Sequence, residues 1–245
     1  MQRYFTQTVV ETDYWLDKET YHHAVVVLRM KVGDQFELVD GKQKVYLMEL
    51  AQIEGKNAQA LKIAQLESKV ELPVALTVAC GLSKGDKAEW IVQKATELGA
   101  SEFIFFKGDY SVAKWDEKKV NKKLARLQKI AQGAAEQSHR TLIPKVSYAS
   151  NVRALTNFNG LKLLAYEESA KQGETSNLAK LATKLKQNPQ PLIAVFGPEG
   201  GISPAEVEIL TEADFILAGL GPRILRAETA PLYLLAALSY ALELE

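Results

Sequence analysis

The stretch that decides the fold class is residues 196–206, which read FGPEGGISPAE and join an apolar strand to a helix. Ser203 and Glu206 have the spacing of a capping box, and Pro204 occupies the first helical position. Strands and helices also alternate on both sides of this stretch, which predicts an α/β domain with a parallel sheet covered by helices on both faces. From the apolar periodicity, strands are expected at Val74–Cys80, Phe103–Phe106, Leu161–Ala165, Leu192–Phe196 and Phe215–Ala218, and helices at Lys87–Leu98, Glu117–Gln137, Leu178–Leu185, Pro204–Leu210 and from Ala230.

The first 70 residues show a different pattern, with short strands separated by turn residues. Ala24–Arg29 is rich in β-branched residues, Gln35–Val39 alternates polar and apolar residues, and Asp40-Gly41 indicates a hairpin leading to Lys44–Leu50. Strands of this length and spacing predict a small β-barrel or sandwich. We expect the domain boundary at Lys69–Pro73, because the alternation of strands and helices begins directly after it.

The composition limits the class of protein. The chain has 245 residues with 30 basic and 30 acidic side chains, so bulk charge alone cannot hold a nucleic acid. The single cysteine, Cys80, allows no internal disulfide, and three histidines leave little for a metal site, so we expect no metal. The start at Met1 lacks the apolar run of a signal peptide, and Ala230–Leu242 is too short to cross a bilayer. These features predict a soluble, cytoplasmic protein.

The charges are unevenly distributed along the chain. Residues 1–83 have a net charge of −2, residues 84–145 of +5 and residues 146–245 of −3. The basic middle part could contact phosphates and position a nucleic acid without reading its sequence. The alternative is that the lysines of residues 118–129 form only a solvated helix face.

Two loops are the strongest candidates for a ligand site. In residues 196–206 the glycines let the backbone approach a ligand closely, although a tight turn would use the same residues. This loop matches neither the P-loop nor the dinucleotide pattern G-x-G-x-x-G. Residues 220–231, LGPRILRAETAP, place two arginines beside an apolar pair, although Glu228 and Thr229 would also suit an ordinary helix start. Because each loop follows a strand, both are expected at the carboxyl edge of the sheet, where open α/β sheets bind ligands.

Five motifs in this order resemble the SPOUT methyltransferases, and in particular the RsmE family of bacterial 16S rRNA uridine-N3 methyltransferases. They are GPEGG at 197–201, LG-x-RILR-x-ETA at 220–230, Arg29 with Gly33-Asp34, KATELG at 94–99 and EQSHR at 136–140. Together they cover nearly the whole chain. His139 departs from the family pattern, and we assign it no role.

The resemblance implies a PUA-like RNA-binding β-barrel over residues 1–70 and a SPOUT α/β domain with a C-terminal trefoil knot over residues 73–245. The implied reaction is methylation of uridine N3 by S-adenosylmethionine, and the implied partner is 16S rRNA or the small ribosomal subunit. It also implies a homodimer with the last helix in the interface, although the apolar residues 232–242 would equally form an intramolecular core helix.

By the same resemblance, S-adenosylmethionine binds to backbone groups and apolar side chains of the two loops, and the end of the Leu161–Ala165 strand closes the pocket. The residues implied to bind it are Tyr166, Glu167, Phe196, Gly197, Pro198, Glu199, Gly200, Leu220, Gly221, Ile224, Leu225, Thr229 and Ala230. The residues expected to contact RNA are Arg3, Arg29, Lys84, Lys87, Arg126 and Arg140.

Methylation at uridine N3 requires alignment of the acceptor and removal of the N3 proton. Arg226 could stabilise negative charge on the uracil oxygens, and Glu228 or Glu199 could accept the proton, although Glu228 could equally be a helix-start carboxylate. If His22 and His23 lie on a strand, they point to opposite faces and cannot form a paired site.

Three other functions compete with this one. A nucleotide-phosphate binder could use the glycines of residues 197–201, but the lysine and hydroxyl expected for phosphates and magnesium are missing. A non-catalytic RNA-binding protein would keep the barrel and the basic segment, but the intact loop at residues 220–229 argues against it. A SPOUT methyltransferase for another rRNA or tRNA position would share both loops.

Overall fold

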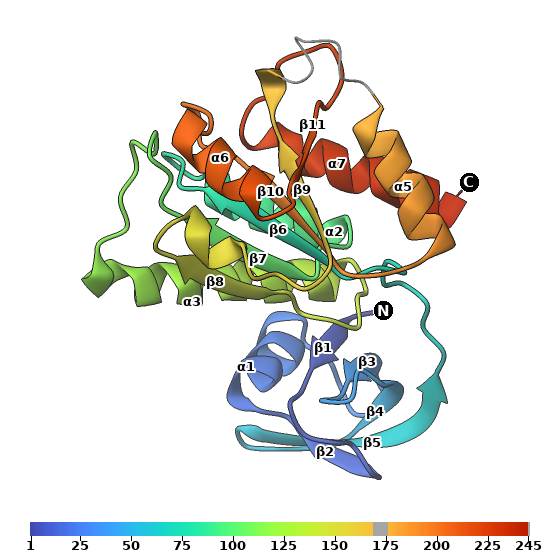
Figure 1. Ribbon diagram of the computed structural model, residues 1–245. Helices are drawn as coiled ribbons and strands as arrows, with labels where there is room; N and C mark the ends of the chain where they lie inside the picture. Colours follow the sequence, from blue (N-terminus) through green and yellow to red (C-terminus); the bar gives the residue numbers. More distant parts are fainter. Residues whose placement is uncertain (169–175, 245) are drawn as a thin grey trace. The chain divides into compact units, whose positions relative to one another are not determined.

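The computed structural model describes residues 1–168 and 176–244. The chain divides into two compact units (Figure 1). Unit 1 is Met1–Glu71 together with Ala135–Leu142, and unit 2 is Leu72–Ala134 together with Ile143–Glu245. The short segment Ala135–Leu142 thus groups with residues that lie far from it in the sequence.

Unit 1 contains a mixed five-stranded sheet in the order β1-β3-β4-β5-β2, in which β1 is parallel to β3 and the other pairs are antiparallel. The hairpin predicted around Asp40-Gly41 is confirmed as β3 and β4, and their side chains Phe36 and Met48 are fully buried in the core. The elements are β1 Arg3–Phe5, β2 Asp13–Trp15, the helix α1 Lys18–Tyr21, a π-helix His22–Val27, β3 Gln35–Val39, β4 Val45–Glu54 and β5 Asn57–Leu66.

The strand predicted at Ala24–Arg29 is wrong, because these residues continue the helical turns that begin at Lys18. The Asp17 side chain accepts hydrogen bonds from the backbone N–H groups of Glu19 and Thr20, which starts the helix. The cap and the burial of Ala24 outweigh the β propensity of the valines that follow. His22 and His23 therefore lie on a helix, and the argument that placed them on opposite faces of a strand does not apply.

Unit 2 is built on a six-stranded sheet in the order β11-β9-β10-β6-β7-β8, with every pair parallel. This confirms the α/β prediction, including every predicted strand and helix of the unit to within a few residues; the strand β8 was not predicted. The strands are β6 Leu76–Gly81, β7 Glu102–Phe106, β8 Lys145–Ala149, β9 Leu161–Ala165, β10 Leu192–Phe196 and β11 Ile216–Ala218. The helices are α2 Lys87–Glu97, α3 Glu117–Gln137, α5 Asn177–Gln187, α6 Pro204–Glu212 and α7 Thr229–Ser239, with a 3-10 turn Val152–Leu155 and a π-helix Tyr240–Leu244.

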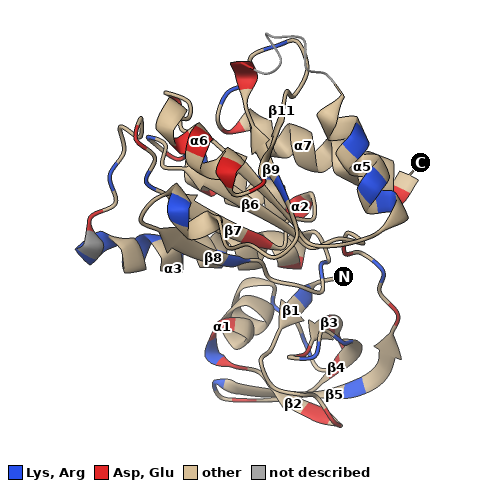
Figure 2. Cartoon of the chain, viewed as in Figure 1, with Lys and Arg blue, Asp and Glu red and all other residues tan. Residues whose placement is uncertain are grey.

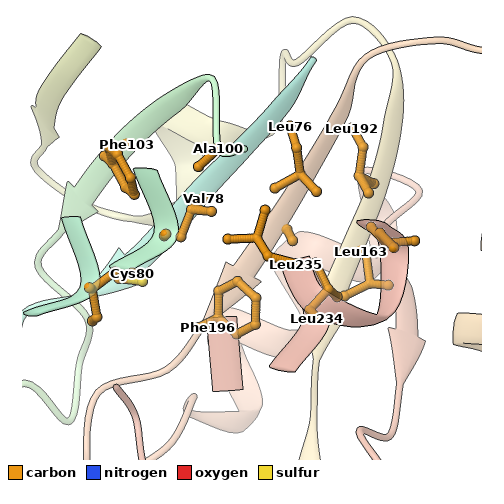
Figure 3. Packing of buried hydrophobic residues seen from close by; sticks show 14 of the residues in the cluster. Leu76, Val78, Cys80, Ala100, Phe103, Leu163, Leu192, Phe196, Leu234 and Leu235 are labelled. Atoms are coloured by element: carbon orange, nitrogen blue, oxygen red, sulfur yellow. The ribbon is translucent and has the colours of Figure 1, made fainter. Parts of the chain in front are cut away.

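The helix α7 packs into the core of unit 2. Leu234 and Leu235 lie among Leu76, Leu192 and Phe196 of the sheet (Figure 3). The chain leaves β11 at one edge of the sheet and returns to α7, which contacts β10 in the sheet and the helix α2. Such a return is what the predicted C-terminal knot requires.

One face of α7 is thus a core face, as the intramolecular alternative proposed. The outer side of this helix and of the π-helix after it exposes Tyr233, Tyr240 and Leu244. Among the described residues, no helix is both long and apolar enough to cross a membrane.

Candidate functional site

A cavity of about 760 Å³ lies where three neighbouring strands of unit 2 end. The residues after β9 contribute one wall, the loop after β10 a second and the loop after β11 a third. The cavity is lined by Lys87, residues 165–168, residues 196–202, Pro204, residues 220–227 and Ala230. The two loops singled out from the sequence therefore meet at one site at the carboxyl edge of the sheet, as predicted.

The cavity brings together the predicted cofactor residues, with one exception. Thr229 is not among its lining residues; its backbone N–H donates to the Arg226 carbonyl over 2.9 Å, which closes a turn at the start of α7. Arg226 and Glu199, two of the predicted catalytic residues, line the cavity. Glu228 does not, and its side chain lies next to Lys87.

The loop after β10 is held in place by a set of hydrogen bonds, of which the sequence predicted only the capping box. The capping box is confirmed, with the Ser203 N–H donating to Glu206 Oε2 over 2.9 Å and the Glu206 N–H donating to Ser203 Oγ over 3.2 Å. Ser203 Oγ also donates to Asp109 Oδ2 over 2.6 Å, and the Asp109 N–H donates to Glu206 Oε1 over 3.0 Å. Through Asp109, the loop after β7 therefore holds the loop after β10 in place.

Gly200 shows why this loop needs glycine. A Cβ at this position would lie 2.9 Å from the Tyr110 Cβ and 3.1 Å from the Tyr110 carbonyl oxygen, so a larger residue would push the two loops apart. Sequence reasoning missed Asp109 and Tyr110, because nothing local marks residues that act through a tertiary contact.

The loop after β11 is shaped by Gly221, whose φ of +91° is a conformation that L side chains rarely adopt. Beyond it, Ile224 and the side chains of Arg223 and Arg226 are exposed at the cavity rim. The wall after β9 joins this loop, since the Tyr166 N–H donates to the Ala218 carbonyl over 3.0 Å. The cavity therefore combines an apolar and main-chain interior with two cations at its mouth.

Lys87, predicted as an RNA contact, lies instead in the cavity wall. Its Nζ is 2.8 Å from Glu199 Oε1 and 3.5 Å from Glu228 Oε2. Chiefly through the hydrogen bond to Glu199, and against partial burial, the pKa of Lys87 is raised. Burial raises the pKa of the Glu199 carboxyl, but the Lys87 ammonium and backbone N–H groups, including that of Lys84, outweigh it and lower the pKa overall. A carboxylate stabilised in this way is a poor proton acceptor, which argues against Glu199 as the base.

The remaining predicted RNA residues divide by burial. Arg3 and Arg140 are buried within unit 1, where Arg3 Nε donates to Glu37 Oε2 over 2.8 Å and Arg140 Nε donates to Glu71 Oε2 over 3.0 Å. Arg3 also donates to the carbonyls of His139 and Arg140, so Arg3 fastens the segment Ala135–Leu142 to the sheet, and Arg140 fastens it to Glu71 after β5. Their burial argues against the predicted contact with RNA.

Arg29, Lys84 and Arg126 are exposed. Arg29 has a positive φ of 58°, directly after the unpredicted π-helix. Arg126 Nη2 is 2.8 Å from Glu89 Oε2 in a solvent-facing pair on α3 and α2. Lys and Arg positions, blue in Figure 2, are spread along α3, in agreement with the basic middle of the sequence.

Two family models match the chain. An RNA methyltransferase domain matches residues 70–239, and an RNA methyltransferase PUA domain matches residues 16–63. The chain is 45% identical to the ribosomal RNA small subunit methyltransferase E of Bacillus subtilis, with 100% of this chain and 98% of that protein covered. The chain belongs to the ribosomal RNA small subunit methyltransferase E family. This confirms the resemblance drawn from the five motifs and, with it, the predicted order of a PUA-like unit before an α/β methyltransferase unit.

Solved structures agree with the membership in the methyltransferase E family. The family member from Neisseria gonorrhoeae, solved with bound S-adenosyl methionine, superposes with a TM-score of 0.85 at 28% identity, over 98% of this chain and 97% of that one. A Legionella pneumophila protein in complex with the same cofactor has a TM-score of 0.81 at 27% identity, over 98% and 97% of the two chains.

Proposed function

We propose that the chain transfers the methyl group of S-adenosylmethionine to N3 of one uridine in the 16S rRNA of the small ribosomal subunit. The observation that carries the proposal is that the loops after β10 and β11 line one cavity together, at the edge of the sheet where such a cofactor is expected. Family membership supports methylation of small-subunit rRNA, and the choice of uridine N3 rests on the sequence resemblance.

The residues of the cavity suit S-adenosylmethionine. The close packing of Gly200 on Tyr110 and the positive φ of Gly221 leave backbone groups of both loops open to an adenosine. Leu220, Ile224 and Leu225 offer an apolar surface for the adenine, and the carboxylates at residues 167, 168 and 199 suit the cofactor's positive groups. When bound, the cofactor supplies an electrophilic methyl group.

The groups of the protein then align the acceptor and manage its proton. To Arg226, which lines the cavity and is exposed, we assign stabilisation of the negative charge that develops on the uracil oxygens. We assign the N3 proton to Glu228 rather than Glu199, because the Lys87 ammonium and backbone N–H groups lower the pKa of Glu199 and weaken it as a base. Glu228 occupies the N-cap of α7 without making a side-chain capping bond, so a helix-start role would come from its charge at the helix N-terminus alone.

RNA binding and assembly form the second part of the proposal. Arg29 in unit 1 and Lys84 and Arg126 in unit 2 are exposed cations suited to phosphate contact, each within its own unit. We further propose a cytoplasmic homodimer that covers the exposed Tyr233 and Tyr240. Light scattering of the purified protein tests the dimer, and a monomer at micromolar concentration would exclude it.

The reaction itself is tested by incubating the purified protein with labelled S-adenosylmethionine and either small subunits or naked 16S rRNA from cells that lack the gene. A methyl group on uridine N3 blocks Watson–Crick pairing, so reverse transcription should stop at one position, and nucleoside mass spectrometry should find 3-methyluridine. Ribose methylation, or a methylated guanine, would refute the proposed acceptor. Cofactor binding without transfer to either RNA would favour a non-catalytic RNA-binding protein.

The catalytic roles need separate readouts. Glu228→Gln and Arg226→Ala should each reduce the methyl-transfer rate at least about 100-fold, a typical loss for a general base or a charge-stabilising group. Cofactor affinity, measured by calorimetry, should change much less. Unchanged turnover in either variant removes that residue from the mechanism.

A further inference from the structure

Three separate elements of unit 2 meet at one ammonium group. Lys87 is the first residue of α2, Glu199 lies in the loop after β10, and Glu228 precedes α7. Lys87 Nζ contacts both carboxylates, at 2.8 Å for Glu199 and 3.5 Å for Glu228. The backbone N–H of Lys84 adds a hydrogen bond of 3.1 Å to the same Glu199 oxygen.

Neither Lys87 nor Glu228 caps its own helix by a side-chain hydrogen bond. A positive charge at the first residue of a helix opposes the helix dipole, and Lys87 is the first residue of α2. A carboxylate at an N-cap normally accepts from the helix N–H groups, but Glu228 makes no such bond. The side chains of Lys87 and Glu228 point towards each other instead. The starts of α2 and α7 therefore supply oppositely charged groups to the same site.

The two carboxylates are held differently. Glu199 accepts two hydrogen bonds, from Lys87 Nζ and the Lys84 N–H, through one oxygen. Glu228 Oε2 is buried and has no hydrogen-bond partner within the described parts of the chain, because Lys87 Nζ lies too far away to donate well. The Lys87 ammonium at 3.5 Å is the positive charge that offsets the burial of this oxygen.

We propose that Lys87 is a positioning residue for methyl transfer: its ammonium ties the loop after β10 to the start of α7 and so holds the two sides of the cofactor cavity in place. The proposal rests on the function proposed above and adds to it a role that is distinct from RNA contact. It separates the two glutamates, with Glu199 fastening the cofactor loop and Glu228 receiving the proton.

Two measurements on Lys87→Met test the role. Loss of the tie should weaken S-adenosylmethionine binding at least about tenfold in calorimetry. In turnover, the KM for S-adenosylmethionine should rise by a similar factor, while kcat at saturating cofactor should fall less than about threefold. Lys87→Arg keeps the charge and should restore both the affinity and the KM, which a purely structural residue would not do.

Lys84→Met is the matched control, because it removes an equal charge three residues away while the backbone N–H to Glu199 remains. It should leave cofactor affinity within about twofold. If Lys87→Met does not fold, Glu199→Gln removes the same tie from the other side and should weaken cofactor binding similarly.

The proposal is overturned if Lys87→Met binds the cofactor as the parent does with an unchanged KM, or if it instead loses RNA affinity and salt dependence. The second outcome would make Lys87 a phosphate contact. If the proposed function is wrong, the parent protein methylates no RNA. The calorimetric comparison of Lys87→Met with Lys84→Met would still show whether the Lys87 ion pairs support cofactor binding.

Discussion

Replacing Arg140 by methionine should destabilise the protein strongly, although the sequence motif around it reads as a nucleic-acid contact. The Arg140 side chain is only 3% exposed, and it pairs with Glu71, whose side chain is 25% exposed. Arg140 Nε donates to Glu71 Oε2 over 3.0 Å, and an Nη2 hydrogen bond joins the same oxygen. Methionine keeps much of the volume of arginine, so the change isolates the lost charge and hydrogen bonds.

The size of the effect depends on the hydrogen bonds that Glu71 retains after Arg140 is replaced. Removing one partner of a buried ion pair costs about 3–5 kcal/mol, because the other charge stays desolvated. Glu71 retains the N–H groups of Thr141 at 2.8 Å and Leu142 at 3.1 Å, and the Thr141 hydroxyl at 3.2 Å. We therefore expect the lower end, about 3 kcal/mol in the free energy of unfolding, or roughly 6–12 °C in Tm.

Arg126→Met is the matched control, with the same substitution and a glutamate partner at 2.8 Å, but with 69% of the arginine side chain exposed. A solvent-facing pair contributes about 1 kcal/mol or less. Urea unfolding of Arg140→Met is followed in unit 1 by Trp15 fluorescence, with Trp90 and Trp115 replaced by Phe. Unfolding of Arg126→Met is followed in unit 2 by Trp90 and Trp115 fluorescence, with Trp15 replaced by Phe, and each variant is compared with a parent that has the same Trp replacements. If Arg140→Met loses less than about 1 kcal/mol, or no more than Arg126→Met, the assignment of Arg140 to an internal ion pair is refuted.

The pH dependence gives a second readout on the same pair. Burial raises the pKa of Glu71, but the Arg140 guanidinium and backbone N–H groups outweigh it, so the folded-state pKa is below the usual value. The stabilisation is then complete above the unfolded-state pKa, about 4.3 for glutamate, and is lost as the pH falls through the lower folded-state value. The difference in stability between the parent protein and Arg140→Met should therefore be greatest near neutral pH and shrink in acid.

Three further predictions concern unit 2. Gly200→Ala should weaken cofactor binding more than tenfold in calorimetry and lower the free energy of unfolding by about 1–3 kcal/mol, because its Cβ would meet Tyr110 at 2.9 Å; parent-like affinity would contradict the close approach. Glu206→Ala should cost about 2–4 kcal/mol in urea unfolding, since this buried carboxylate accepts from two backbone N–H groups, including that of Ser203; a cost below 1 kcal/mol would contradict it. Cys80 should resist iodoacetamide at pH 8 until the protein is unfolded, because burial raises the pKa of its thiol; rapid labelling of the native protein would count against that burial.

The parts of the fold that the sequence predicted are those specified by local patterns. The buried strand Leu192–Phe196, the capping box at Ser203 and the long helix Glu117–Gln137 depend on residues close to each other in the chain, and the structure has all three at the predicted positions. The strand prediction for Ala24–Arg29 was wrong, because the cap that starts the helical turns lies several residues earlier, at Asp17. The residue pattern of 24–29 alone contains no information about that cap.

The candidate site divides in a similar way. The two loops were found because glycines and mixed polar residues follow strands, and parallel strands bring their ends together. Asp109 and Tyr110 were missed, since their role is visible only where the loop after β7 meets Gly200 and Ser203. Lys87 was predicted as an RNA contact, but its pairing with Glu199 was missed, because a sequence does not show which carboxylate a lysine will contact.

These placements change what the basic residues imply about RNA. Arg3 and Arg140 use their charges inside unit 1, and Lys87 uses its charge in the cofactor cavity. A cation that already pairs with a buried carboxylate releases no counterion when RNA binds, so it adds nothing to the salt dependence of affinity. The net charge of the middle of the chain therefore overstates its phosphate contacts. Under the proposed function we expect exposed cations such as Arg29 and Lys84 to make the phosphate contacts. The number of these exposed cations, rather than the number of basic residues in the motifs, should then set the salt dependence of binding.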